Sequence, residues 1–131
     1  MYTIERTDYG MKHTFRGVLD AREMERWLSD SRHLLAEVDG SFNMVVDMRD
    51  AKPLGAQVEE ILYEGTKLIG RHGLNRGAVV MENPEISRQM RQIAKYANLH
   101  RNERYIDTMT NRNWEQLVKD WVEKGIDPDR A

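Results

Sequence analysis

A buried strand is predicted at Phe42-Asn43-Met44-Val45-Val46-Asp47-Met48, and the rest of the fold is built around it. The segment is short, largely apolar and β-branched at its centre. Gly40 precedes it and charged residues follow it, as is typical of a central strand of a sheet. Residues 76–82 repeat the pattern and predict a second buried strand, and residues 104–107 predict a shorter third strand. The predicted sheet is therefore built around apolar central strands.

Apolar residues at helical spacing occupy the segments before, between and after these strands and predict four helices. The first helix is expected to begin after the N-cap Asp20, and the third after the N-cap Asn83. The fourth is expected to be capped by Thr110 or Asn111 and to end at Gly125. Each helix has one apolar face to pack against the sheet.

Two helix positions give specific packing predictions. Trp114 and Trp121 are seven residues apart, two turns along one helical face, so we expect both to be buried together against the sheet. Gly65 falls on the inward face of the second helix, where the missing side chain would let the helix approach the sheet closely.

The N-terminal segment predicts a β-hairpin, with extended residues 2–6 and 13–18 separated by the turn formers Asp8-Tyr9-Gly10. The strand–helix alternation that follows requires parallel crossovers. We therefore expect an α/β fold in one domain, residues 1–125, with a mostly parallel sheet of four or five strands, an N-terminal hairpin and four helices. Residues 126–131 are expected to form a flexible C-terminal tail.

The composition excludes several classes of protein. The chain has 131 residues, a net charge of −2 and no cysteine, which removes disulfide frameworks, thiolate zinc sites and cysteine nucleophiles. It lacks a basic and then apolar leader, and its longest apolar run is residues 78–81, so we expect no membrane span and a cytoplasmic location.

The basic residues Arg88, Arg91 and Lys95 share one exposed face of the third predicted helix. Three positive charges form only a modest stripe, the net charge of the chain is negative, and Tyr96 and Tyr105 are the only aromatic residues nearby. We therefore expect no specific binding of nucleic acid.

The most suggestive segment for function is residues 47–56, at the end of the central strand and in the predicted loop that follows it. Parallel sheets place their binding sites in such loops, at the carboxyl ends of the strands. Backbone amides at the start of the next helix could receive an anion, two carboxylates could hold a hard cation, and turn formation with helix capping explains the same residues without a ligand. The candidate binding residues are Asp47, Arg49, Asp50, Lys52, Leu54, Gly55 and Gln57.

No constellation in the sequence identifies an enzyme. The four histidines, His13, His33, His72 and His100, lie in different predicted elements, lack metal-ligand spacing and have no adjacent nucleophile. The glycines between residues 65 and 77 match no nucleotide-binding motif. We expect a non-catalytic protein with no metal and no cofactor.

Three local patterns, together with the order of the elements, resemble the SpoIIAA-like (STAS) family. The patterns are residues 16–20 (RGVLD) before the first helix, residues 44–48 (MVVDM) at the end of the central strand, and residues 105–108 (YIDT) followed by residues 114–117 (WEQL). This family includes bacterial anti-sigma-factor antagonists and cytoplasmic domains of sulfate transporters.

The resemblance implies a STAS-like fold and a role that is mostly not enzymatic. Family members dock partner proteins through the loop and helix after the central strand, and some are switched by phosphorylation of a serine there. The matching region of this chain, residues 47–55, contains neither serine nor threonine. The resemblance therefore points to a divergent member outside the phosphorylated antagonist group.

These observations lead to a primary hypothesis and two alternatives. The primary hypothesis is a regulatory or protein-binding domain that works through residues 49–56 and the start of the second helix, with self-association also expected. The first alternative is a carrier of small molecules or lipids of the CRAL-TRIO type, which would need an apolar cavity beside the second helix. The second is an enzyme using Asp47, Asp50 and a histidine.

Overall fold

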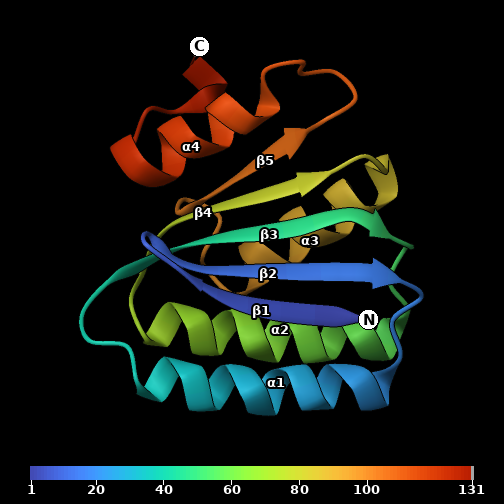
Figure 1. The fold of residues 1–131 in the computed structure, drawn as a ribbon. Helices are drawn as coiled ribbons and strands as arrows, with labels where there is room; N and C mark the ends of the chain where they lie inside the picture. Colours follow the sequence, from blue (N-terminus) through green and yellow to red (C-terminus); the bar gives the residue numbers. More distant parts are fainter. Residues whose placement is uncertain (131) are drawn as a thin grey trace.

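The computed structural model describes residues 1–130, which form one five-stranded sheet and four α-helices (Figure 1). The elements follow one another as β1 (Tyr2–Thr7), β2 (Gly10–Gly17), α1 (Ala21–Ala36), β3 (Phe42–Ala51), α2 (Ala56–Arg71), β4 (Leu74–Met81), α3 (Pro84–Tyr96), β5 (Glu103–Asp107), α4 (Trp114–Lys124) and the 3-10 turn η1 (Pro128–Arg130).

The strands lie in the sheet in the same order as in the chain, so β3 is the central strand. The β1–β2 pair is antiparallel, and the pairs β2–β3, β3–β4 and β4–β5 are parallel. The predicted α/β fold, with an N-terminal hairpin on a mostly parallel sheet, is confirmed. The carboxyl ends of β2 to β5 therefore meet at one edge of the sheet, which we call the carboxyl edge.

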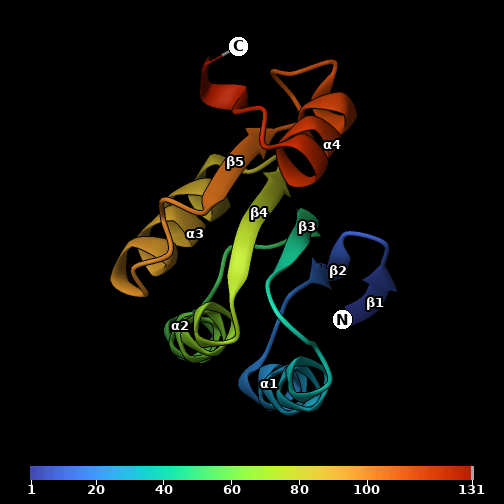
Figure 2. The same ribbon diagram turned by 90° about the vertical axis from the view of Figure 1, so that its left-hand side faces the viewer.

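The helices cover the two faces of the sheet unequally (Figure 2). On the face that we call the closed face, α1, α2 and α3 enclose the main core, whose largest fully buried side chains include Trp27, Phe15, Met11 and Met24. On the other face, which we call the open face, α4 is the one α-helix among residues 1–130 that packs on β3, β4 and β5. The face of β1 and β2 beside α4 carries polar residues such as Lys12 and Thr14.

Two of the predicted helix caps are confirmed by hydrogen bonds. The Asp20 Oδ1 atom accepts from the Glu23 N–H at 2.8 Å, and the Asn83 Oδ1 atom accepts from the Glu85 N–H at 2.8 Å. Each bond satisfies one of the free amides at a helix start. The left-handed Gly125, with φ of 70°, ends α4 as expected.

The predicted cap of the fourth helix is wrong. The N-cap of α4 is Asn113, and Thr110 and Asn111 lie in the turn before it. The Asn111 side-chain amide instead donates to the backbone oxygen of Asp107 at 2.8 Å. Asn111 thus stabilises the turn after β5, and the helix starts later than the pattern of capping residues indicated.

The prediction that Gly65 lets the second helix approach the sheet is wrong, because the residue that fills the space is Trp27 of α1. A Cβ atom at this position would lie 2.2 Å from the Cη2 atom of Trp27, so the glycine makes room for the indole of α1. The Trp27 Nε1–H also donates to the Nδ1 atom of the buried His13 at 2.9 Å. The close approach is therefore between α1 and α2.

The prediction that both tryptophans of α4 are buried is confirmed for Trp121 and wrong for Trp114. Trp121 is buried, and its Nε1–H donates to the backbone oxygen of Gly77 at 2.9 Å. Trp114 is only partly buried, because it is the first residue of α4 and lies beside the end of β3, where the guanidinium of Arg49 covers its ring. Seven-residue spacing placed both rings on one helix face, but the sheet does not extend equally under both.

The C-terminal segment is attached to β5 within the described residues. The Arg104 Nε atom lies 2.8 Å from the Asp127 Oδ1 atom, and the guanidinium of Arg104 lies over the ring of Trp121. The end of the predicted tail, residue 131, lies outside the described residues. No helix within residues 1–130 is long and apolar enough to cross a membrane.

Candidate functional site

The candidate residues occupy the carboxyl edge, but β3 extends further into them than predicted. β3 continues to Ala51, so Arg49 and Asp50 are strand residues and not loop residues. In the β2–β3 register Thr14 lies beside Asp47 and Arg16 beside Asp50, which leaves one extra residue in β3. This bulge keeps the charged residues in the strand while it re-aims their side chains.

Asp47 and Arg49 form a bidentate ion pair on the open face. The Arg49 Nε and Nη2 atoms donate to Asp47 Oδ1 at 3.0 Å and to Oδ2 at 2.8 Å, and the Arg49 N–H donates to Oδ1 at 3.1 Å. Burial favours a higher pKa for the Asp47 carboxyl, but the bonds and charge from Arg49 outweigh it and hold the pKa below its ordinary value. Asp47 therefore stays ionised and paired, and it is not an available base.

The guanidinium of Arg49 also packs on the ring of Trp114, with its carbon 4.6 Å from the ring centroid. Such a cation–π contact orders an arginine that would otherwise be free at the surface. Asp47, Arg49 and Trp114 thus form one stack that joins the end of β3 to the start of α4. Asp47 and Arg49 were predicted site residues, whereas Trp114 was predicted to belong to the core.

Leu54 is a structural residue and not an exposed binding residue. Its side chain is buried, its N–H donates to the Gln89 Oε1 atom at 2.9 Å, and its backbone oxygen accepts from Gln89 Nε2 at 2.8 Å. The loop is also held at its start, where the Lys52 N–H donates to the Gly17 backbone oxygen at 3.0 Å. The connection between β3 and α2 is therefore fixed at both ends.

The remaining candidates are accessible. Asp50, Lys52, Gly55 and Gln57 are exposed, as is Pro53 between them. Gly55 is the N-cap of α2, and it makes no side-chain cap bond. These residues form the rim of the carboxyl edge.

Two strongly exposed apolar side chains lie at the same edge. Val18, directly after β2, is 79% exposed, and Met109, two residues after β5, is 72% exposed. Because β2 and β5 are separated by three strand spacings of about 4.8 Å, they are roughly 14 Å apart in the sheet. We call the set Val18, Asp50, Lys52, Pro53, Gln57 and Met109 the carboxyl-edge surface. Val18 and Met109 were not predicted as site residues, although Val18 is the last residue of one predicted strand and Met109 lies two residues after another.

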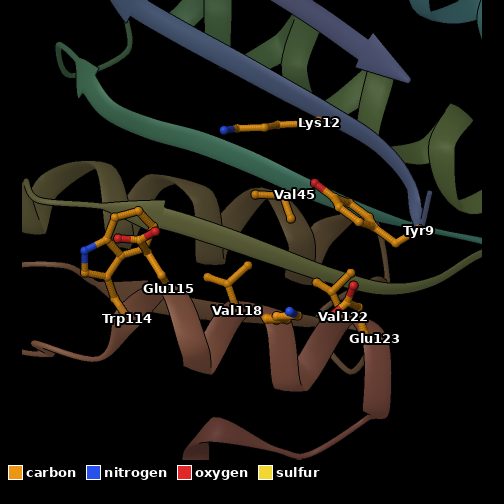
Figure 3. A pocket seen from close by; sticks show the side chains of 9 residues that line it. Tyr9, Lys12, Val45, Trp114, Glu115, Val118, Val122 and Glu123 are labelled. Atoms are coloured by element: carbon orange, nitrogen blue, oxygen red, sulfur yellow. The ribbon is translucent and has the colours of Figure 1, made fainter. Parts of the chain in front are cut away.

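A groove of about 290 Å³ lies between α4 and the open face of the sheet, next to the stack (Figure 3). Figure 3 shows Tyr9 and Trp114 at its opposite ends, with Val45 between them. It is also lined by Lys12, Glu115, Val118, Lys119, Val122 and Glu123. The two lysines and two glutamates balance, so the groove selects no charge class.

The N-terminal hairpin places Tyr9 in this groove. A Cβ atom at Gly10, whose φ is 146°, would lie 1.9 Å from the Asn43 backbone oxygen, so the turn can lie this close to β3 only with glycine. The Tyr9 backbone oxygen also accepts from the Asn43 N–H at 3.0 Å. The turn signal at residues 8–10 was visible in the sequence, but the position of Tyr9 across from Trp114 was not.

The closed face contains a much smaller internal space, of about 20 Å³, lined by His13, Trp27, Thr66, Glu103 and apolar residues. It has room for about one water molecule, whereas small-molecule pockets are usually 300 Å³ or larger. Burial lowers the pKa of His13 to about 4 and raises the pKa of the Glu103 carboxyl to about 7. This enclosed space beside α2 is too small for a lipid, and the depression of about 300 Å³ between α2 and α3, lined by residues such as Tyr63 and Ile93, is open to solvent.

The described residues do not assemble a metal site. Among residues 1–130, no three histidine, aspartate or glutamate side chains come together as metal ligands would. Asp47 is neutralised by Arg49, and Asp50 projects at the exposed rim.

Comparison with known proteins rests on structure. No protein-family model matches the sequence, and no curated protein matches it significantly. Among solved structures, the chain is similar to an uncharacterized protein of the DUF3478 family with a SpoIIAA-like fold, from Shewanella loihica PV-4. The two are 15% identical, the match covers 90% of this chain and 92% of that one, and the TM-score is 0.58.

This chain has a SpoIIAA-like fold. The resemblance stated from residues 16–20, 44–48, 105–108 and 114–117 is thereby confirmed for the fold. The solved SpoIIAA-like protein is itself uncharacterized, so the match carries no substrate, ligand or partner. The role of the chain has to be argued from its own surface.

Proposed function

We propose that this chain is a non-catalytic binding domain that docks a protein partner through the carboxyl-edge surface. The observation that carries the proposal is the exposure of Val18 and Met109 on either side of the charged residues Asp50 and Lys52. Burying an exposed valine or methionine in an interface contributes about 1.5–3 kcal/mol each, and the charges between them would select the partner.

The rigidity of the edge supports the same proposal. Gln89 holds the backbone of Leu54, and Gly17 holds that of Lys52. A surface that is already ordered loses little conformational entropy when a partner binds. The stack of Arg49 on Trp114 extends this order to the start of α4.

The two alternatives have less support. A carrier needs an apolar cavity, and the closed-face space beside α2 is about 20 Å³. An enzyme using Asp47 needs a nearby histidine, but His13 points into the closed face, and His33, His72 and His100 lie in a last helical turn or in segments that lead into strands. These three histidines therefore lie near the amino ends of the strands, opposite the carboxyl edge.

Site-specific photo-crosslinking in the producing cells tests the proposal. A photoreactive amino acid is placed at position 18 or 109, and at position 96 as the matched control, because Tyr96 is 69% exposed on α3 and away from the carboxyl edge. We expect discrete adducts from positions 18 and 109, none from position 96, and weaker adducts when Lys52→Glu is added. Mass spectrometry of the adducts separates a foreign protein from a second copy of the chain. Absence of adducts at both edge positions, or the same adducts from position 96, would overturn the proposal.

A further inference from the structure

The two outer strands of the sheet differ in how their free edges are covered. β5 contacts the C-terminal segment, which the ion pair between Arg104 and Asp127 holds in place. Among residues 1–130, β1 pairs with β2 alone, and Figure 2 shows its outer side facing away from the other elements. An uncovered edge strand presents unpaired N–H and C=O groups to another chain.

The hydrogen bonds at the start of β1 identify which groups are free. Met1 and Arg16 exchange both backbone bonds, at 2.8 and 2.9 Å. In an antiparallel pair such residues alternate, so Thr3, Glu5 and Thr7 also bond toward β2. The backbone groups of Tyr2, Ile4 and Arg6 therefore point outward, at every second residue, as an added strand requires.

A surface depression beside this edge leaves room for the side chains of an added strand. It lies between β1 and α1 and is lined by Tyr2, Thr3, Ile4, Asp30, His33 and Leu34. Ile4 is half-buried there beside Leu34, and Asp30 is exposed. Proline, lysine and a bulge, which commonly protect an edge, are missing from residues 2–7, and the charged residues there are one acid and one base, Glu5 and Arg6.

We propose that two copies of this chain pair through β1, antiparallel, about a twofold axis at Ile4. In this register Ile4 faces Ile4 of the second copy, and Tyr2 faces Arg6 of the second copy. The Tyr2 hydroxyl already donates to the Asp30 Oδ2 atom at 2.5 Å, so Arg6 of one copy arrives beside Asp30 of the other. The twofold axis repeats this opposite-charge contact, which makes the edge complementary to itself.

Arg6 is available for this contact. Within one copy it pairs with Glu37 at 3.4 Å, with side chains 58% and 67% exposed, and an exposed pair of this kind contributes little. The surface involved is separate from Val18, Lys52 and Met109. Pairing through β1 therefore leaves the carboxyl-edge surface of both copies free.

Sedimentation equilibrium across a concentration series tests the pairing. We expect a reversible monomer–dimer equilibrium, from 15.4 kDa to twice that mass. Arg6→Glu and Asp30→Arg should each raise the dimer dissociation constant at least tenfold, and the double variant Arg6→Glu/Asp30→Arg should restore dimerisation. Arg16→Glu, an equal charge change on exposed β2, is the control and should leave the constant unchanged.

Hydrogen exchange gives an independent readout on the unmodified chain. The outward amides of Ile4 and Arg6 should become protected as the concentration rises, whereas exposed amides of the loop after β3 should not. A monomer at every concentration up to about 1 mM, or a dimer unaffected by both single charge reversals, would overturn the pairing. Either result leaves the crosslinking test of the carboxyl-edge surface intact.

Discussion

The closed and open faces of the sheet are built from the same strands but serve different needs. On the closed face, three helices bury Trp27, Phe15 and Met24 completely and even enclose the polar His13 and Glu103. On the open face, α4 covers part of the sheet and leaves Trp114 half-buried beside a groove. The stability of the fold therefore comes mainly from the closed face, while the accessible polar and charged side chains lie on the open face and at the carboxyl edge.

Replacing a tryptophan on each face should show the largest contrast. Trp27→Ala removes a fully buried indole and its bond to His13, so we expect a loss of about 3–5 kcal/mol in the free energy of unfolding. Trp114→Ala removes a half-buried ring and should cost about 1–2 kcal/mol. Urea unfolding of both variants measures the difference. Equal losses in the free energy of unfolding would show that the closed face does not contribute more to stability than the open face.

The pH dependence of stability tests the difference between the faces, because two buried groups whose pKa values are shifted by burial, His13 and Glu103, belong to the closed face. The pKa of Glu103 rises from 4.5 to about 7 on folding, so its contribution to stability is lost as pH rises through that window. The pKa of His13 falls from 6.5 to about 4, so its contribution is lost as pH falls through the overlapping window. Each effect amounts to roughly 3 kcal/mol, and in the native chain the two oppose each other.

Single variants should separate these effects. Relative to the native chain, Glu103→Gln should become progressively more stable as pH rises from 4.5 to 7, and His13→Gln should become progressively more stable as pH falls from 6.5 to 4. Urea unfolding at pH 4, 5.5 and 7 provides the measurement. Differences from the native chain that do not change with pH would show that neither group titrates in the core.

A smaller effect than at Trp27 is expected at Gln89, where α3 contacts the loop after β3. Gln89→Leu removes both bonds to the backbone of Leu54 and leaves a buried N–H without a partner, at a cost of about 1–3 kcal/mol. The loop after β3 should also exchange its amides faster, while the amides of β4 stay protected. Unchanged exchange in the loop would show that Gln89 does not order the carboxyl edge.

Much of the fold was predictable because each element has a local signal. Asp20 and Asn83 cap helices with their own side chains, and residues 42–48 are apolar enough to be strand in almost any context. The candidate site was predictable only in its location. Arg49 and Asp50 looked like loop residues because they are charged, yet a bulge keeps them in β3.

The sequence by itself determined the order of strands and helices, the parallel sheet and the edge at which the charged residues gather, because periodicity and capping depend on neighbours within a few turns. The tertiary structure alone decided that Leu54 is buried, that Trp114 lies under Arg49, and that Val18 and Met109 remain exposed. Burial depends on what lies opposite a residue in space. For this chain that is set by the single helix on the open face and by strands that are far apart in the sequence.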